Sequence, residues 1–166
     1  MRLDVGEARE TGVADQINLI VSGIVNSGVL WANGSTLTVQ GAVSGNGTAT
    51  IDGVGTLDFE ASTIANVVFG SGTGGTLKLG DSFHFNGTIS GFGGSDVIDL
   101  ANVASATASF SYHENAAGTG GTLAISDGAQ TLELSLLGDY SADNFSIVPD
   151  PVHGTLITYV PHDLML

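Results

Sequence analysis

Cysteine is absent from the 166-residue chain, which excludes a disulfide framework, thiolate catalysis and cysteine-ligated zinc. Basic residues are almost as scarce, because Arg2, Arg9 and Lys78 stand against 17 aspartates and glutamates, for a formal net charge of −14. Binding to phosphate backbones needs clustered lysine and arginine, so nucleic acid is not expected as a partner. The same charge disfavours anionic membrane surfaces. It favours cations, above all calcium, which prefers carboxylate and carbonyl oxygens as ligands.

Long apolar runs are also missing. No stretch approaches the ~20 residues that a membrane-spanning helix requires, so we expect no membrane insertion. Residues 1–15 lack the basic-then-apolar pattern of a signal peptide. An exported protein with this sequence is therefore expected to be a fragment or to carry its export signal elsewhere.

The residues that are abundant are typical of a β-rich protein. Hydrophobic residues make up 42% of the sequence, too many for a disordered segment, and 25 glycines against three prolines indicate many tight turns. Threonine, valine, isoleucine and leucine recur in short runs, whereas long helix-forming stretches are missing. These features predict an all-β fold.

A period of twenty residues runs through the first hundred positions. Leu37–Val39, Leu57–Phe59 and Leu77–Leu79 follow one another at this interval, each with an apolar, polar, apolar pattern. Ile17–Leu19 lies one period upstream, and Ile98–Leu100 lies one period plus one residue downstream. Alternation of period two is expected of a strand with one buried and one wet face.

Further columns share this register. They comprise an asparagine column, an apolar column and a column of small residues, in that order: Asn26, Asn46, Asn66 and Asn86; Val29, Ala49, Phe69 and Ile89; Ser22, Ala42, Ser62 and Ser82. Asparagine tolerates left-handed backbone, and its amide can donate and accept along a stack of like residues. Such columns predict that successive coils lie on one another.

We therefore expect a parallel β-solenoid, with coils of about twenty residues whose apolar columns fill the interior. Residues 1–16 form a lead-in or flexible segment, residues 17–100 form the coils, and residues 101–166, where the period is lost, form an irregular β-rich cap. The cap would cover strand edges that otherwise recruit another chain. An antiparallel sandwich with strands every ten residues is the alternative.

Several stretches resemble a known group of proteins. They are Ile24–Gly28, Thr36–Val43, Gly55–Phe59, Gly120–Gly128 and Leu136–Phe145. Together they are similar to repeat modules of large exported or surface β-solenoid proteins of rhizobia and related proteobacteria. The resemblance implies an extracellular or cell-surface location, an adhesin-like role and a calcium-binding context, and it implies no enzyme activity.

A further segment, Gly91–Asp99, resembles one hemolysin-type nonapeptide, G-G-x-G-x-D-x-U-x. In that repeat the glycines offer carbonyl oxygens and the aspartate supplies charge. The resemblance makes Asp96 a calcium ligand, with the carbonyls of Gly91 and Gly93 beside it and Asp99 as a weaker candidate. Phe92 replaces the second glycine, and no adjacent copy follows. The alternative is a solenoid corner with Asp96 facing solvent.

The period also places Asn18, Thr38, Asp58, Lys78 and Asp99 in one outward column. Enzymes with a parallel β-helix fold that cut or epimerise polysaccharides hold carboxylates and basic groups in such a groove, but a surface ion pair explains the same residues. We expect a non-catalytic structural and interaction module with calcium as the candidate cofactor. Extracellular glycans or surface proteins are the candidate partners, and a polysaccharide-binding or polysaccharide-modifying β-helix is the alternative function.

Overall fold

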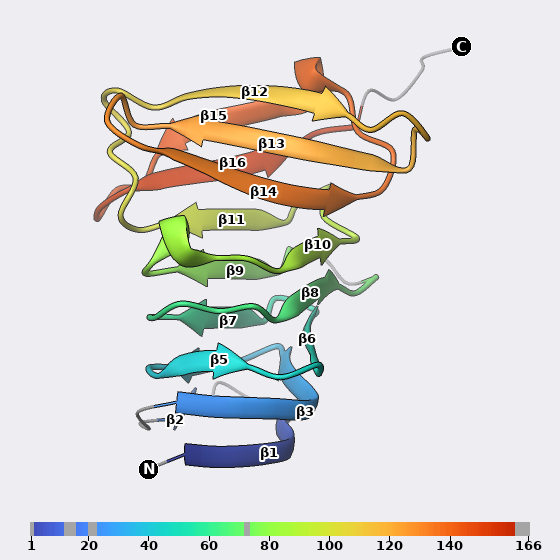
Figure 1. Ribbon diagram of the computed structural model, residues 1–166, viewed down its shortest axis with the longest axis vertical. Helices are drawn as coiled ribbons and strands as arrows, with labels where there is room; N and C mark the ends of the chain where they lie inside the picture. Colours follow the sequence, from blue (N-terminus) through green and yellow to red (C-terminus); the bar gives the residue numbers. More distant parts are fainter. Residues whose placement is uncertain (1, 12–15, 20–22, 72–73, 162–166) are drawn as a thin grey trace.

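The computed structural model describes residues 2–11, 16–19, 23–71 and 74–161, and before residue 23 it defines the backbone alone. It is a parallel β-solenoid of about four turns with a β-rich end, as the sequence predicted. Figure 1 shows the coils stacked along the long axis, with β1 at the bottom and the antiparallel strands at the top. Two sheets face each other across the interior.

The strands divide between a sheet A and a sheet B. Sheet A runs in the order β1 (Arg2–Thr11), β3 (Gly23–Asn33), β6 (Thr48–Asp52), β8 (Asn66–Phe69), β10 (Thr88–Ser90), β14 (Thr131–Leu137), β13 (Gly120–Ser126) and β12 (Ser109–Glu114), with β5 (Ala42–Ser44) also pairing with β3. Sheet B runs β15 (Phe145–Pro149), β16 (Thr155–Tyr159), β11 (Val97–Leu100), β9 (Thr76–Leu79), β7 (Thr56–Phe59), β4 (Thr36–Val39) and β2 (Gln16–Leu19). Two short 3-10 helices, η1 (Ser82–His84) and η2 (Ala142–Asn144), complete the described elements.

The leucine column of sheet B is confirmed. Leu37, Leu57 and Leu77 are register partners on successive parallel strands, and all three are fully buried. By register the column begins at Ile17 and continues through Ile98. Because each coil buries its apolar face only against its neighbours, this column is a main source of the stability of the stack.

Sheet A does not keep the twenty-residue period, so the predicted column of Val29, Ala49, Phe69 and Ile89 is wrong in two of its members. The observed partners are Leu30, Ala49, Val67 and Ile89, at intervals of 19, 18 and 22 residues. Phe69 belongs to a neighbouring column with Ala32 and Ile51. The segments that connect the two sheets differ in length. The strands of sheet A therefore pair at unequal intervals, whereas the first strands of sheet B keep the interval of twenty residues.

The asparagines consequently do not form a ladder. Asn66 has Thr48 rather than Asn46 as its register partner, and its Oδ1 accepts a hydrogen bond from the Thr88 N–H at 3.0 Å. Asn26 is buried, and its amide donates to the carbonyl oxygen of Thr48 at 2.9 Å. Each of these amides thus binds a backbone group of the next coil instead of another asparagine.

The two ends of the chain depart from the regular coils in different ways. At the N-terminal end β1 pairs in parallel with β3, so the parallel sheet begins before residue 17 and includes part of the predicted lead-in. At the C-terminal end β14 pairs in parallel with β10, after which β13 and β12 add in antiparallel. In sheet B, β16 pairs with β11 in antiparallel, and β15 then pairs with β16 in antiparallel. The end region is therefore an antiparallel extension of both sheets.

Aromatic rings fill the space between the sheets in this region. Tyr140 lies with its ring centroid 5.0 Å from that of Tyr159, and Phe145 lies 4.9 Å from Tyr159. Burial raises the pKa of Tyr140 to about 12. Gly121 makes room for the Tyr112 ring, since a Cβ there would lie 2.6 Å from the Tyr112 hydroxyl oxygen.

The buried column predicts a large cost for a cavity. Leu57→Ala should lower the free energy of unfolding by about 2–5 kcal/mol, because neighbouring coils hold the space open. Val54→Ala is the matched control, since Val54 is 66% exposed in the same coil and should change stability by no more than about 0.5 kcal/mol. Urea unfolding followed by circular dichroism measures both, and equal effects would contradict the interior position of Leu57.

Candidate functional site

The loop predicted to bind calcium is a tight corner before β11. Asp96 is only 6% exposed, and its Oδ1 accepts a hydrogen bond from the Gly75 N–H at 2.9 Å, one coil earlier. Its Oδ2 accepts another from the Gly93 N–H at 3.1 Å, and the Asp96 N–H donates to the Gly93 carbonyl oxygen at 3.0 Å. Gly91 has φ +73°, and a Cβ there would meet the Phe69 carbonyl oxygen at 2.2 Å. The carboxylate therefore ties two coils together.

This geometry differs from the alternative in which Asp96 faces solvent. The loop is a corner, but the Asp96 side chain points inward to backbone N–H groups rather than to solvent. Burial raises the pKa of Asp96, and the hydrogen bonds from Gly93 and Gly75 oppose that rise. Phe92, which departs from the nonapeptide pattern, is buried, with its ring centroid 5.5 Å from that of Phe69.

Asp99 does not join Asp96. It lies on β11 as the register partner of Lys78, in the outward column of sheet B. The part of the chain described by the structure contains no group of three or more histidine, aspartate or glutamate side chains that could hold a metal ion. Calcium binding by Asp96, Asp99 and the carbonyls of Gly91 and Gly93 stays a prediction.

The predicted column is present in register, but it is less exposed than predicted, because Thr38 and Asp58 are buried and Lys78 and Asp99 are only partly exposed. Thr38, Asp58, Lys78 and Asp99 are successive register partners on β4, β7, β9 and β11. The Lys78 ammonium lies 3.2 Å from Asp58 Oδ2, and the lysine side chain remains 41% exposed against 11% for the aspartate. One cation is thus held between two carboxylates along the stack.

Charges and burial along this column shift the pKa values of Asp99 and Lys78. Burial raises the pKa of Asp99, the charges of Asp150 and Asp58 raise it further, and Lys78 opposes them. Burial acts to lower the pKa of Lys78, but attraction to its carboxylate neighbours, chiefly Asp58, gives a net rise. The Oδ1 atoms of Asp58 and Asp99 are buried and have no hydrogen-bond partner within the described structure.

A cavity of about 360 Å³ adjoins the column. Its walls are Lys78, Asp99, Ala101, Asp150, Val152 and His153. Asp150 and His153 come from the loop between β15 and β16, which antiparallel pairing with β11 brings alongside. Sequence reasoning did not assign these two residues to a site, because the chain separates them from Asp99 by about fifty positions.

The loop that carries them is ordered by its own hydrogen bonds. The His153 N–H donates to Asp150 Oδ2 at 2.8 Å, and the Asp150 N–H donates to the Gly154 carbonyl oxygen at 3.2 Å. Gly154 has φ +101°, a conformation that side chains rarely adopt. An ammonium group, two carboxylates and an imidazole therefore border one small cavity, which suits a polar ligand rich in hydroxyl groups.

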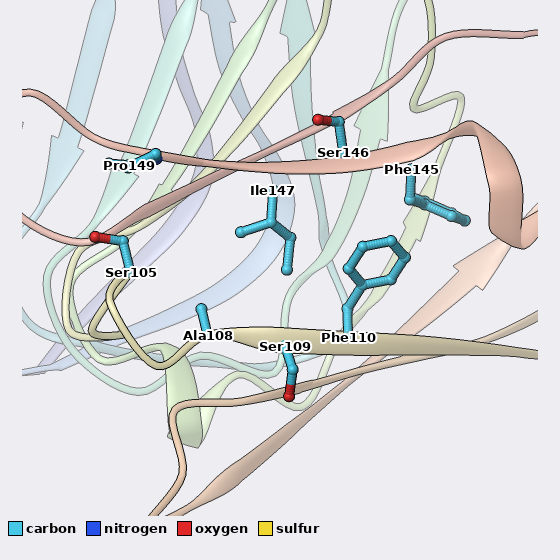
Figure 2. Close-up of a pocket in the computed structure, with 8 residues that line it drawn as sticks. All are labelled: Ser105, Ala108, Ser109, Phe110, Phe145, Ser146, Ile147 and Pro149. Atoms are coloured by element: carbon cyan, nitrogen blue, oxygen red, sulfur yellow. The ribbon is translucent and has the colours of Figure 1, made fainter.

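A second concavity, with both polar and apolar lining, lies at the end of the stack. It is a groove of about 540 Å³ lined by Ser105, Ala108, Ser109, Phe110, Phe145, Ser146, Ile147 and Pro149. Figure 2 shows the Phe110 and Ile147 side chains pointing toward each other from β12 and β15 across this space. We call it the end groove.

Comparison with known proteins assigns neither concavity a function. No family model, curated protein or solved structure matches the chain. Among the described residues, no helix is long and apolar enough to cross a membrane.

The hydrogen bonds of Asp96 predict that its replacement by asparagine lowers the stability of the fold even without a metal. Asp96→Asn places an amide N–H₂ opposite one of two backbone N–H donors, so the free energy of unfolding should fall by about 1–3 kcal/mol in chelator. Asp143→Asn on the exposed η2 is the control. A further loss that appears only with calcium would support the ligand role of Asp96. Unchanged stability in chelator would contradict a stabilising role for the Asp96 hydrogen bonds to Gly75 and Gly93.

Asp99 predicts a dependence of stability on pH. Its pKa is raised above 3.8 in the folded chain, so the folded state binds the proton more tightly than the unfolded state does. The stability that this proton contributes is fully present below pH 3.8 and is lost as pH rises through the raised pKa. Asp99→Asn should therefore raise the melting temperature at neutral pH and change it little near pH 3.8. Asp127, whose pKa is lowered by hydrogen bonds from Gln130 and Ala129, should show the opposite trend when replaced by asparagine. Thermal melts across this range test both, and parallel trends would contradict the assignment.

Proposed function

We propose that the chain is a non-catalytic structural and interaction module of a secreted or cell-surface bacterial protein, with an adhesive role. The observation that supports this is the outer face of sheet B. There, Thr38, Asp58, Lys78 and Asp99 repeat once per coil over a fully buried leucine column. Parallel strands stand ~4.8 Å apart, so the column places one polar side chain per coil on a rigid support, and Lys78 and Asp99 are the members that are partly exposed.

An extended, hydroxyl-rich polymer is the partner that this face fits best. The partly exposed Lys78 and Asp99 lie on adjacent strands and can donate to and accept from the hydroxyl groups of such a polymer, and the cavity that they border can hold one sugar unit. The resemblance to exported solenoid repeats supports the same choice. Extracellular glycans are therefore the proposed ligand class, ahead of surface proteins.

Calcium is part of this proposal as a stabilising ion. The chain has 17 carboxylates and three basic residues, so self-repulsion opposes the compact state. Any cation that binds the folded form alone must raise stability by mass action. Magnesium is the control for general screening of charge, because a specific calcium site would discriminate between the two ions.

A second candidate is supported by the cavity itself. Lys78, Asp99, Asp150 and His153 bring acid, base and cationic groups to one place, which is the set of groups that polysaccharide cleavage by β-elimination or hydrolysis employs. Under this alternative the module would shorten the glycan that it binds.

Glycan-array binding tests these functions together. Lys78→Met and Asp99→Asn should each reduce binding at least about tenfold if the column carries it, whereas Glu133→Gln, an exposed change on β14, should leave binding unchanged. The array is run with calcium, with magnesium and with chelator. Binding lost equally in all three variants, or no binding to any glycan, would contradict the glycan role. Shortening of a bound glycan by the wild type but not by Asp99→Asn would establish the second candidate.

A further inference from the structure

Sheet B reverses direction twice after the last regular coil. β16 is antiparallel to β11, and β15 is antiparallel to β16. The final strand β15 therefore runs in the same direction as β2, β4, β7, β9 and β11. Within the described residues, no strand pairs with the outer edge of β15 or with the outer edge of β2, which lies at the other end of the same sheet.

The apolar column of sheet B also continues into this last strand. Ile98 is the register partner of Ile157, and Ile157 is the partner of Ile147 on β15. Ile157 is fully buried, whereas Ile147 is only partly buried and borders the end groove. The column therefore ends on a side chain that a further coil would cover.

On the other half of this end, β12 is also an edge strand with no partner beyond it among the described residues. η2 packs against β12, and the hydroxyl oxygen of Tyr159 accepts hydrogen bonds from Ser141 and Asn144 at either end of this turn. In Figure 1 the short helix stands above β12, beside the open edge of β15. An incoming coil can therefore approach both edge strands, and along sheet B it meets β15 and the end groove.

We infer that this end binds the first coil of a second copy of the chain, with β2 of one molecule paired in parallel along β15 of the next. The two strands have four and five residues, and their common direction extends the parallel ladder of sheet B. In that register Ile17 of the incoming copy takes the position above Ile147, because Ile17 already begins the column at its own end.

Charge favours this head-to-tail contact over a symmetric pairing of two β15 edges. Residues 101–161 contain no lysine or arginine and six carboxylates: Glu114, Asp127, Glu133, Asp139, Asp143 and Asp150. Residues 2–19 contain two of the three basic residues of the chain, Arg2 and Arg9, beside four carboxylates. Pairing two β15 ends would bring together two wholly acidic regions, and the mixed N-terminal end repels an acidic region less. The contact is heterologous, so it generates linear assemblies rather than closed dimers.

Sedimentation equilibrium of the full chain, from micromolar to millimolar concentration, tests the inference. The weight-average mass of the wild type should rise with concentration beyond about twice that of the monomer. Ile147→Lys and Ile17→Lys should each remain monomeric, because each removes one of the two different ends. Mixing them should give a heterodimer that does not grow, since each variant keeps the end that the other lacks.

Ser146→Lys is the matched control, because Ser146 is the exposed neighbour of Ile147 on the same strand and adds the same charge. Circular dichroism confirms that each variant is folded, and Gln16→Pro at the first residue of β2 replaces Ile17→Lys if that variant unfolds. A wild type that stays monomeric at every concentration overturns the inference. Equal loss of association in Ser146→Lys and Ile147→Lys also overturns it. Association that persists in both Ile17→Lys and Gln16→Pro overturns it as well.

Discussion

The fold depends on one constraint, which is that every coil must return to the same register in sheet B. Leu37, Leu57 and Leu77 occupy equivalent positions because parallel strands pair evenly and a slip of one residue would turn each leucine outward. The same alternation aligns Asp58 with Lys78 on the opposite face. The buried column and the charged column are therefore two faces of one register, and neither can be changed without the other.

This constraint also explains how much of the structure the sequence could predict. The solenoid, the leucine column and the Asp58–Lys78 pair followed from a repeat of twenty residues combined with a strand period of two. The equivalent prediction for sheet A was wrong at Val29 and Phe69, since corners of unequal length shift that sheet relative to the repeat. A regular spacing in the sequence therefore predicts the register of sheet B, whose strands repeat every twenty residues, but not the register of sheet A, whose intervals vary.

The sites were harder to predict for a different reason. The glycine-rich loop identified Asp96 as special, but the direction of its carboxylate depends on the N–H of Gly75 in the coil below. No pattern within the loop contains that information. Asp150 and His153 reach Asp99 through antiparallel pairing of a distant strand, and contacts of this kind depend on the tertiary structure rather than on any local spacing.

The unequal intervals of sheet A have a consequence for how such a sequence can evolve. Between Ala49 and Val67 the interval is 18 residues and between Val67 and Ile89 it is 22, yet Leu57 and Leu77 remain twenty residues apart on the other wall. A deletion at one corner of a coil can thus be compensated by an insertion at a neighbouring corner, with the leucine wall undisturbed. Paired insertions and deletions of this kind would diversify the outer loops of related chains while their hydrophobic columns stay aligned.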